Sequence, residues 1–143
     1  PYLDSVVTLS RSVYQQGRMP AIDILSTSSA ALTPNVVGQD HYETAVKAQV
    51  MLNRAQSLER MVALVGESEL SPENQLIYKR AEKIKNFMSQ SFFVAEEQTG
   101  RPGVYVPLAD TISGVKAILE GKADQVPEDK LKYIGKLSEV IKS

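Results

Sequence analysis

Few side chains in this sequence are suited to catalysis. The chain has one histidine, His41, and no cysteine, which excludes thiol chemistry, disulfides and a zinc site that needs two histidines. No phosphate-binding Gly-x-x-x-x-Gly-Lys-Ser/Thr loop occurs. A Ser/His/Asp triad is formally possible, but no nucleophile elbow supports it, and a lone histidine at a helix start is more typical of capping or packing. We therefore expect no catalytic residue, no metal ligand and no turnover from this chain alone.

Residues 87–103, FMSQSFFVAEEQTGRPG, form the stretch whose residue types favour binding. An aromatic pair, Phe92 and Phe93, precedes Val-Ala-Glu and Thr-Gly-x-Pro-Gly. By pattern alone, such a pair is more typical of a core than of a ligand site. A basic cluster lies just before this stretch, at helical spacing and with Glu82 among its members, which favours a solvated face over an anion site. Its members are Lys79, Arg80, Lys83 and Lys85.

The elements that must position these residues are predicted to be helices. Apolar residues recur at three- and four-residue steps from Gln39 to Gly66, a suitable C-cap. Ser71 as N-cap and Pro72 at the first helical position open a second helix. A third helix is expected over 109–120, and a fourth is expected to begin at Pro127 and reach Ile141. The predicted fold class is mainly α, a small helical bundle. The expected inward stripe of the first helix comprises Tyr42, Ala45, Val46, Gln49, Leu52, Ala55, Leu58, Met61, Val62 and Val65.

Residues 1–38 have a different texture, rich in Ser, Thr and Pro. Short strands are predicted over 6–9 and 20–25, with a short helix over 10–16 closed by Gly17 and a loop over 26–38. Two short strands are too few for a stable sheet, so we expect the missing strands upstream and the chain to be a fragment or processed product. We predict that 39–143 folds alone, whereas 1–38 packs loosely.

Several motifs follow one another along nearly the whole chain. Besides 87–103, they are Leu3-Asp4, Leu9-Ser10-Arg11, Gly17-x-x-Pro20-Ala21-Ile22-Asp23, Val37-Gly38-Gln39-Asp40-His41-Tyr42, Asp110-Thr111-Ile112 and Leu119-Glu120-Gly121-Lys122. Their order and spacing resemble the C-terminal part of the catalytic β subunit of F-type ATP synthases. The resemblance implies that 1–38 is the C-terminal edge of an α/β nucleotide-binding domain and that 39–143 is the helical C-terminal domain.

The resemblance also implies a nucleotide pocket. Phe92 stands where the family has the aromatic residue that lies against the adenine, and Ala95 belongs to the same motif. Met19 and Gln98 stand where the family has two further aromatics. Methionine can still line a base. An amide at position 98 cannot stack on it, and the loss of one base–aromatic stack costs about 1–3 kcal/mol of binding free energy. The implied cofactors are ATP or ADP with Mg in the full-length subunit, with no tight binding to this fragment.

Residues 68–74 occupy the place of the family's acidic lever tip, which touches the rotating stalk. The resemblance therefore implies partner contacts for Glu69, Leu70, Ser71 and Glu73. Without the resemblance, the local sequence favours a simpler interpretation, a solvated turn with a good N-cap.

The assembly that the resemblance implies is a proton-translocating ATP synthase or ATPase. Its partners are α-type subunits in an alternating hexamer and a γ-type central-stalk subunit. Contact with the membrane is indirect, at the cytoplasmic face of a bacterial membrane or the matrix or stromal side of an organelle. A net charge of −1 gives no argument for nucleic acid. Two alternatives are a non-catalytic helical interaction module and a weakly nucleotide-binding β-like subunit of a specialised ATPase.

Overall fold

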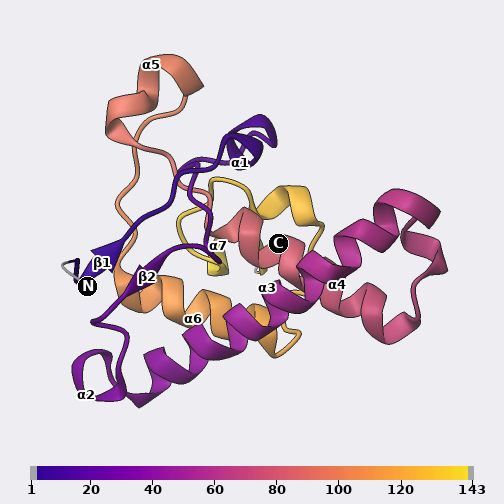
Figure 1. Cartoon of the computed structure of the whole chain (residues 1–143). Helices are drawn as coiled ribbons and strands as arrows, with labels where there is room; N and C mark the ends of the chain where they lie inside the picture. Colours follow the sequence, from indigo (N-terminus) through magenta and orange to yellow (C-terminus); the bar gives the residue numbers. More distant parts are fainter. Residues whose placement is uncertain (1–2, 142–143) are drawn as a thin grey trace.

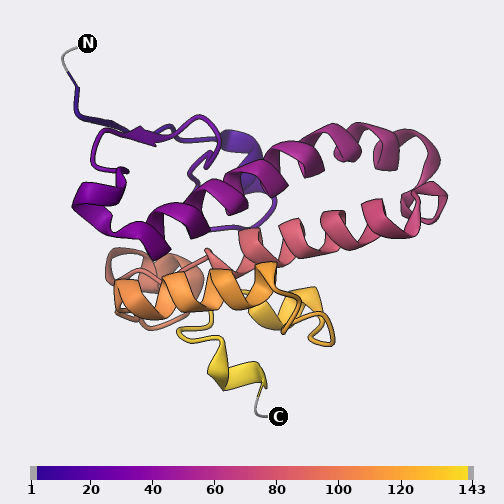
Figure 2. The ribbon, with the colours of Figure 1, turned by 90° about the horizontal axis from the view of Figure 1, so that it is seen from below.

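The computed structural model describes residues 3–141 and is mainly helical, as predicted (Figure 1). Its longest element is helix α3 (Gln39–Val65), which runs antiparallel to α4 (Pro72–Phe87). Helix α6 (Leu108–Leu119) packs against both of them. The α3–α4 hairpin extends beyond the rest of the molecule in both ribbon views (Figure 2).

Local sequence signals define the ends of the hairpin helices. Gly66 ends α3 with a φ of 92°, in the left-handed region that glycine adopts without strain. The 3₁₀ turn η1 (Glu67–Glu69) follows. Ser71 then caps α4, because its hydroxyl accepts a 3.3 Å hydrogen bond from the backbone N–H of Asn74, and Pro72 takes the first helical position. The predicted helix boundaries here are confirmed.

The core lies where α3, α4 and α6 meet, and it extends to the 3₁₀ turn η3 (Glu128–Leu131). Ile84, Ile118 and Leu131 are its largest fully buried side chains. A Cβ on Gly114 would lie 2.3 Å from Cζ of Phe87, so glycine is what allows α6 to approach α4 this closely. The buried hydrophobic residues of the cluster are Ala48, Leu52, Ala55, Ala81, Ile84, Phe87, Val115, Ile118, Ala123, Leu131 and Leu137.

The buried face of α3 is shorter than the predicted stripe. It ends at Leu58, because the last two turns of the helix project past α6 and have only α4 and the turn η1 beside them. Met61 and Val65 were predicted to face inward, but they are 49% and 57% exposed. The end of α3 therefore presents apolar surface to solvent.

The described part of the N-terminal region holds a two-stranded antiparallel sheet. Strand β1 (Ser5–Val6) pairs with β2 (Ser28–Ser29), and a single bridge joins Leu9 to Ile22. The prediction of a strand over 20–25 is wrong. Its second half is a turn, because the Asp23 carboxylate accepts hydrogen bonds from the backbone N–H groups of Leu25 and Ser26. The short helix is confirmed as α1 (Arg11–Gln15), and the predicted loop contains β2 and α2 (Pro34–Val37).

The prediction of one continuous helix from Pro127 to Ile141 is wrong. The turn η3 ends at Leu131, and the next helix is the short α7 (Ser138–Ile141). Between them Lys132 is extended and Tyr133 has a φ of 58°, which a continuing right-handed helix does not allow. Leu131 and Leu137 are buried all the same. The apolar pattern therefore predicted these core residues correctly but not the conformation of the backbone between them.

Candidate functional site

The segment between α4 and α6 carries most of the predicted nucleotide-binding residues. Phe92 is half-buried and precedes the 3₁₀ turn η2 (Phe93–Ala95), which leads into α5 (Glu96–Thr99). The N–H of buried Ala95 donates to the carbonyl oxygen of Phe92 at 3.2 Å, and the Thr99 hydroxyl donates to that of Ala95 at 2.9 Å. These bonds fix Phe92 and Ala95 in one turn of the loop.

A backbone hydrogen bond ties this loop to the N-terminal region. The N–H of Gln90 donates to the carbonyl oxygen of Met19 at 2.6 Å. The Gln90 side chain also donates to the Val104 carbonyl at 2.8 Å, and the Val104 N–H donates to the Ser91 carbonyl at 3.1 Å. The two limbs of the loop and the segment around Met19 are therefore held together just before Phe92.

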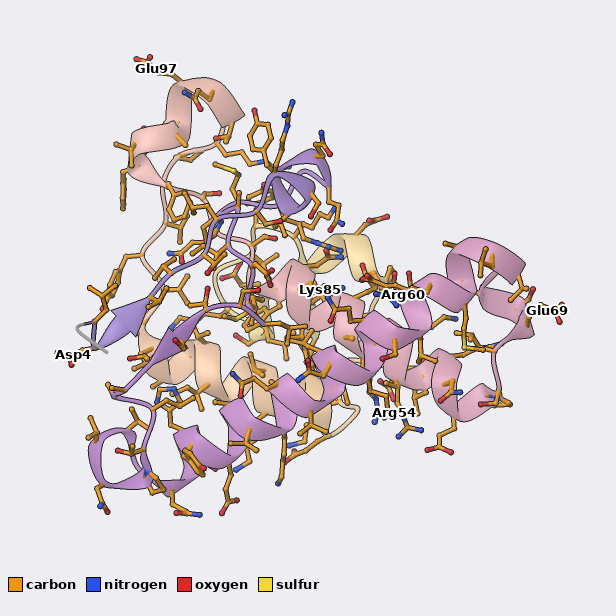
Figure 3. All side chains as sticks on the ribbon, in the orientation of Figure 1. Asp4, Arg54, Arg60, Glu69, Lys85 and Glu97 are labelled. Carbon is orange, nitrogen blue, oxygen red and sulfur yellow. The ribbon has the colours of Figure 1, made fainter. Side chains whose placement is uncertain are left out.

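Three of the four predicted pocket residues therefore lie on segments that contact each other, and Gln98 does not join them. The structure places the Met19 backbone against the loop that carries Phe92 and Ala95. Gln98 is exposed on α5, which lies at an outer end of the molecule, as the position of Glu97 shows (Figure 3). A Cβ on Gly103 would lie 2.5 Å from the Phe93 ring, so this glycine lets the loop fold back on itself.

A second clamp holds the same region from the C-terminal side. The Tyr133 hydroxyl donates to the carbonyl oxygen of Gly17 at 2.7 Å, and the Arg101 guanidinium lies 4.7 Å from the centre of the Tyr133 ring. Tyr133 therefore contacts both the turn before Met19 and the loop that carries Phe92, residues 88–107 between α4 and α6, which we call the Phe92 loop. Nothing in the local sequence around Tyr133 signals this role.

An ion-pair network joins the N-terminal region to both hairpin helices. Arg18 contacts Glu82 at 2.5 Å and donates from Nε to the Asn86 side chain at 3.0 Å. Lys85 bridges Glu82, at 3.1 Å, and Glu59 of α3, at 2.6 Å. The network crosses three segments, and the sequence patterns did not predict it.

Opposing effects act on the pKa values in this network. Burial raises the pKa of the Glu82 carboxyl, but Lys85 and Arg18 outweigh it and hold that pKa below its ordinary value. Burial lowers the pKa of the Lys85 ammonium, but its bonds to Glu59 and Glu82 outweigh it and raise that pKa. Both groups are therefore charged at neutral pH.

The predicted solvated face of the basic cluster is wrong for three of its four members. Lys83 is buried and donates to the carbonyl oxygens of Ala123 and Asp124 at 3.0 and 2.9 Å. Arg80 makes two bonds to the Asp124 carboxylate, at 2.9 and 2.6 Å. Arg80 and Lys83 therefore attach α4 to the segment after α6, and Lys85 attaches α4 to α3. Only Lys79 lies on the solvated face.

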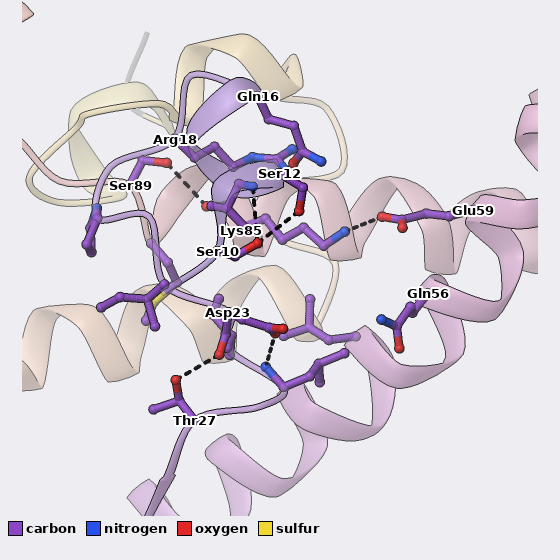
Figure 4. Close-up of a pocket in the computed structure, with 17 residues that line it drawn as sticks. Ser10, Ser12, Gln16, Arg18, Asp23, Thr27, Gln56, Glu59, Lys85 and Ser89 are labelled. Carbon is purple, nitrogen blue, oxygen red and sulfur yellow. Dashed lines mark hydrogen bonds and ion pairs between the residues drawn. The ribbon is translucent and has the colours of Figure 1, made fainter. Parts of the chain in front are cut away.

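A cavity of about 350 Å³ lies between the 10–27 segment and the hairpin helices (Figure 4). Apolar side chains, Leu52 of α3 and Ile24 among them, line it together with the charged groups of Asp23, Glu59 and Lys85. None of the four predicted nucleotide-pocket residues lines it. It neighbours the predicted pocket through Met88 and Ser89, which begin the Phe92 loop.

The hairpin tip presents a mixed surface at the end of the projecting helices. Glu69, Ser71 and Glu73 are exposed, and Figure 3 shows Glu69 pointing away from the molecule. Leu70 is only 4% exposed, so it packs inside the hairpin and supports the turn from within. Three apolar side chains at the end of α3 share one face at helical spacing and are exposed. They are Met61, Leu64 and Val65.

No group of three or more His, Cys, Asp or Glu side chains within residues 3–141 is arranged to hold a metal ion. None of the helices in the same range is both long and apolar enough to cross a membrane.

Comparison with known families gives one match that covers most of the chain. A family model described as the C-terminal domain of V and A type ATP synthase matches residues 30–133. The matched range contains α3, α4 and α6 and the whole Phe92 loop.

Proposed function

Because the chain belongs to the family of C-terminal domains of V and A type ATP synthases, we propose that it serves one subunit of such a rotary machine in two ways. Its Phe92 loop forms part of the adenine pocket, and its α3–α4 hairpin is the lever that acts on a central stalk. The finer assignment to an F-type β subunit, with α-type neighbours, a γ-type stalk and proton transport, is part of this proposal and rests on the motifs of the sequence.

The observation that carries the nucleotide role is the hydrogen bond from Gln90 to Met19. It brings two segments separated by about 70 residues of sequence together beside Phe92, and each of them carries an apolar side chain able to line a base. Mg-ATP or Mg-ADP is the proposed ligand. This sequence carries no Gly-x-x-x-x-Gly-Lys-Ser/Thr loop, so the proposed contacts concern the adenine and not the phosphates or the metal.

Photolabelling of the assembled complex tests this role. An ATP analogue with an azide on its adenine ring should label residues of the Met19 segment or of the Phe92 loop, and excess ATP should prevent the labelling. Labels found only on other parts of the subunit would contradict the adenine role.

The lever role is supported by the shape and surface of the hairpin. Two long helices packed side by side transmit displacement, because a close-packed interface does not deform continuously. The exposed apolar face of Met61, Leu64 and Val65 supplies contact area for a partner, and the exposed acids Glu69 and Glu73 lie in η1 and in the first turn of α4. Replacing 68–74 by glycines should uncouple ATP hydrolysis from rotation in single-molecule recordings and leave nucleotide affinity intact. Undiminished torque would contradict the lever.

A weakly binding, β-like subunit is the second candidate. Methionine at position 19 and an exposed glutamine at position 98 favour it, because neither supplies an aromatic face to the base. Met19→Tyr together with Gln98→Phe should tighten ATP binding if the pocket has the geometry of the family. Equal affinity of the wild type and the double variant would remove this candidate.

A further inference from the structure

Arg18 stands between the proposed adenine pocket and the hairpin. Its neighbour in the chain is Met19, whose carbonyl oxygen is bonded to the loop that carries Phe92. Its guanidinium extends from this segment and contacts Glu82 and Asn86, both on α4. The Arg18 side chain is 12% exposed and that of Glu82 is 18% exposed, so this contact is largely removed from solvent.

The contacts continue from α4 to α3 without a gap. Glu82 receives Arg18 on one carboxylate oxygen, Oε2, and Lys85 on the other, Oε1. Lys85 then reaches Glu59, six positions before the end of α3. The sequence of charges is therefore plus, minus, plus, minus, and each inner member holds two partners at once.

We propose that Arg18 is a positioning residue that couples the Met19 wall of the adenine pocket to the α3–α4 hairpin through the relay Arg18–Glu82–Lys85–Glu59. The inference rests on the proposed function and adds to it the path by which the pocket and the lever communicate. A displacement of the Met19 segment moves the guanidinium, which is tied to α4 at two points.

The physical basis is that partly buried charges tolerate few arrangements. If Arg18 moves without α4, Glu82 loses one of its two cations in a site shielded from water, which is costly. Keeping the pair intact therefore requires the two segments to move together. Asn86 reinforces this linkage, because it accepts from Arg18 and also donates to the Glu128 carbonyl at 3.0 Å, so its orientation is fixed from both sides.

The test uses the assembled complex and compares the hydrogen exchange of residues 61–73 with and without Mg-ATP. Arg18→Gln and Glu82→Gln each break the relay. Each should remove most of the nucleotide-dependent difference in exchange at the tip. The double variant should respond like Glu82→Gln alone, because that variant already breaks the contact that Arg18→Gln removes. Arg18→Lys should restore part of the response, since it keeps the charge.

Lys47→Gln is the matched control, because it removes a charge from an exposed position of α3. Its tip response should equal that of the wild type. Phe92→Ala in the same assay distinguishes a failure of the proposed adenine pocket from a failure of the relay alone. Unchanged ATP affinity in that variant would remove the pocket and the relay with it. Weakened affinity in Phe92→Ala, together with a full tip response in Arg18→Gln and Glu82→Gln, would overturn the relay alone.

Discussion

The hydroxyl of Tyr133 donates a 2.7 Å hydrogen bond to the carbonyl oxygen of Gly17, which lies 116 positions earlier in the chain. The same ring lies beside Arg101, in the Phe92 loop. The C-terminal segment after η3 therefore holds the N-terminal turn and the loop in one place.

Tyr133→Phe should loosen this clamp without unfolding the chain. The variant removes one solvent-accessible hydrogen bond, which is worth about 0.5–1.5 kcal/mol at most, and keeps the ring for Arg101. Hydrogen exchange of the 143-residue chain should become faster around Gly17 and remain unchanged in α3. Tyr105→Phe is the control, because Tyr105 is 79% exposed. Equal exchange around Gly17 in all three proteins would show that the bond does not fix the turn.

Gly114→Ala should destabilise the helical bundle, although alanine is the better helix former. The added Cβ would lie 2.3 Å from the Phe87 ring, and overpacking of this kind costs about 1–3 kcal/mol, more than the gain of about 1 kcal/mol in helix propensity. Urea unfolding should show a lower midpoint. The control is Ser113→Ala, an exposed position on the same helix. A midpoint at or above that of the wild type would mean that α6 shifts away from α4 at no cost.

Lowering the pH should reduce the stability of the folded chain, because Glu82 and Asp124 become protonated. Bonding to Arg80 lowers the pKa of Asp124 and outweighs its burial, and the pKa of Glu82 is lowered by Lys85 and Arg18 despite its burial. Since both folded-state pKa values lie below the unfolded ones, the stabilisation is complete above the unfolded values. It is lost as the pH falls from the ordinary values of 4.5 and 3.8 through the folded-state pKa values.

Urea unfolding at a series of pH values from neutral to acid checks this. Glu82→Gln and Asp124→Asn should each be less stable than the wild type at neutral pH, and each should flatten the acid decline. Glu97→Gln, which changes an exposed carboxyl on α5, should leave the profile unchanged. A wild-type stability that does not vary between neutral pH and pH values below 3.8 would contradict the prediction.

The apolar face at the end of α3 should matter more for partner contact than the acids of the tip. Met61→Ser, Leu64→Ser and Val65→Ser combined should lower torque in single-molecule rotation, because they remove contact area that only a partner can cover. Glu69→Gln and Glu73→Gln should have little effect, since exposed ion pairs contribute little. Val50→Ser, at a position of α3 that is 63% exposed, is the control. Loss of torque from the two acid variants, with none from the apolar variant, would reverse this order.

The helical elements could be predicted because their signals are local. Ser71 and Pro72 start α4, and Gly66 ends α3, as the sequence indicates. The ends of the chain were predicted less well, because Asp23 and Tyr133 impose backbone turns inside apolar runs that read as regular elements. Spacing on one helix also shows only which residues share a face. It could not show that Arg80, Lys83 and Lys85 face carboxylates and carbonyl oxygens of distant segments.

The most direct test of the account is the ATP affinity of the assembled complex with Phe92→Ala. Tyr105→Ala is the control, because it removes an exposed aromatic ring from the same loop. The account predicts that Phe92→Ala weakens ATP binding by about 1–3 kcal/mol, the range for the loss of one base–aromatic stack, whereas Tyr105→Ala leaves it unchanged. An unaltered dissociation constant in a correctly assembled Phe92→Ala complex would contradict the claim that this loop forms the adenine pocket.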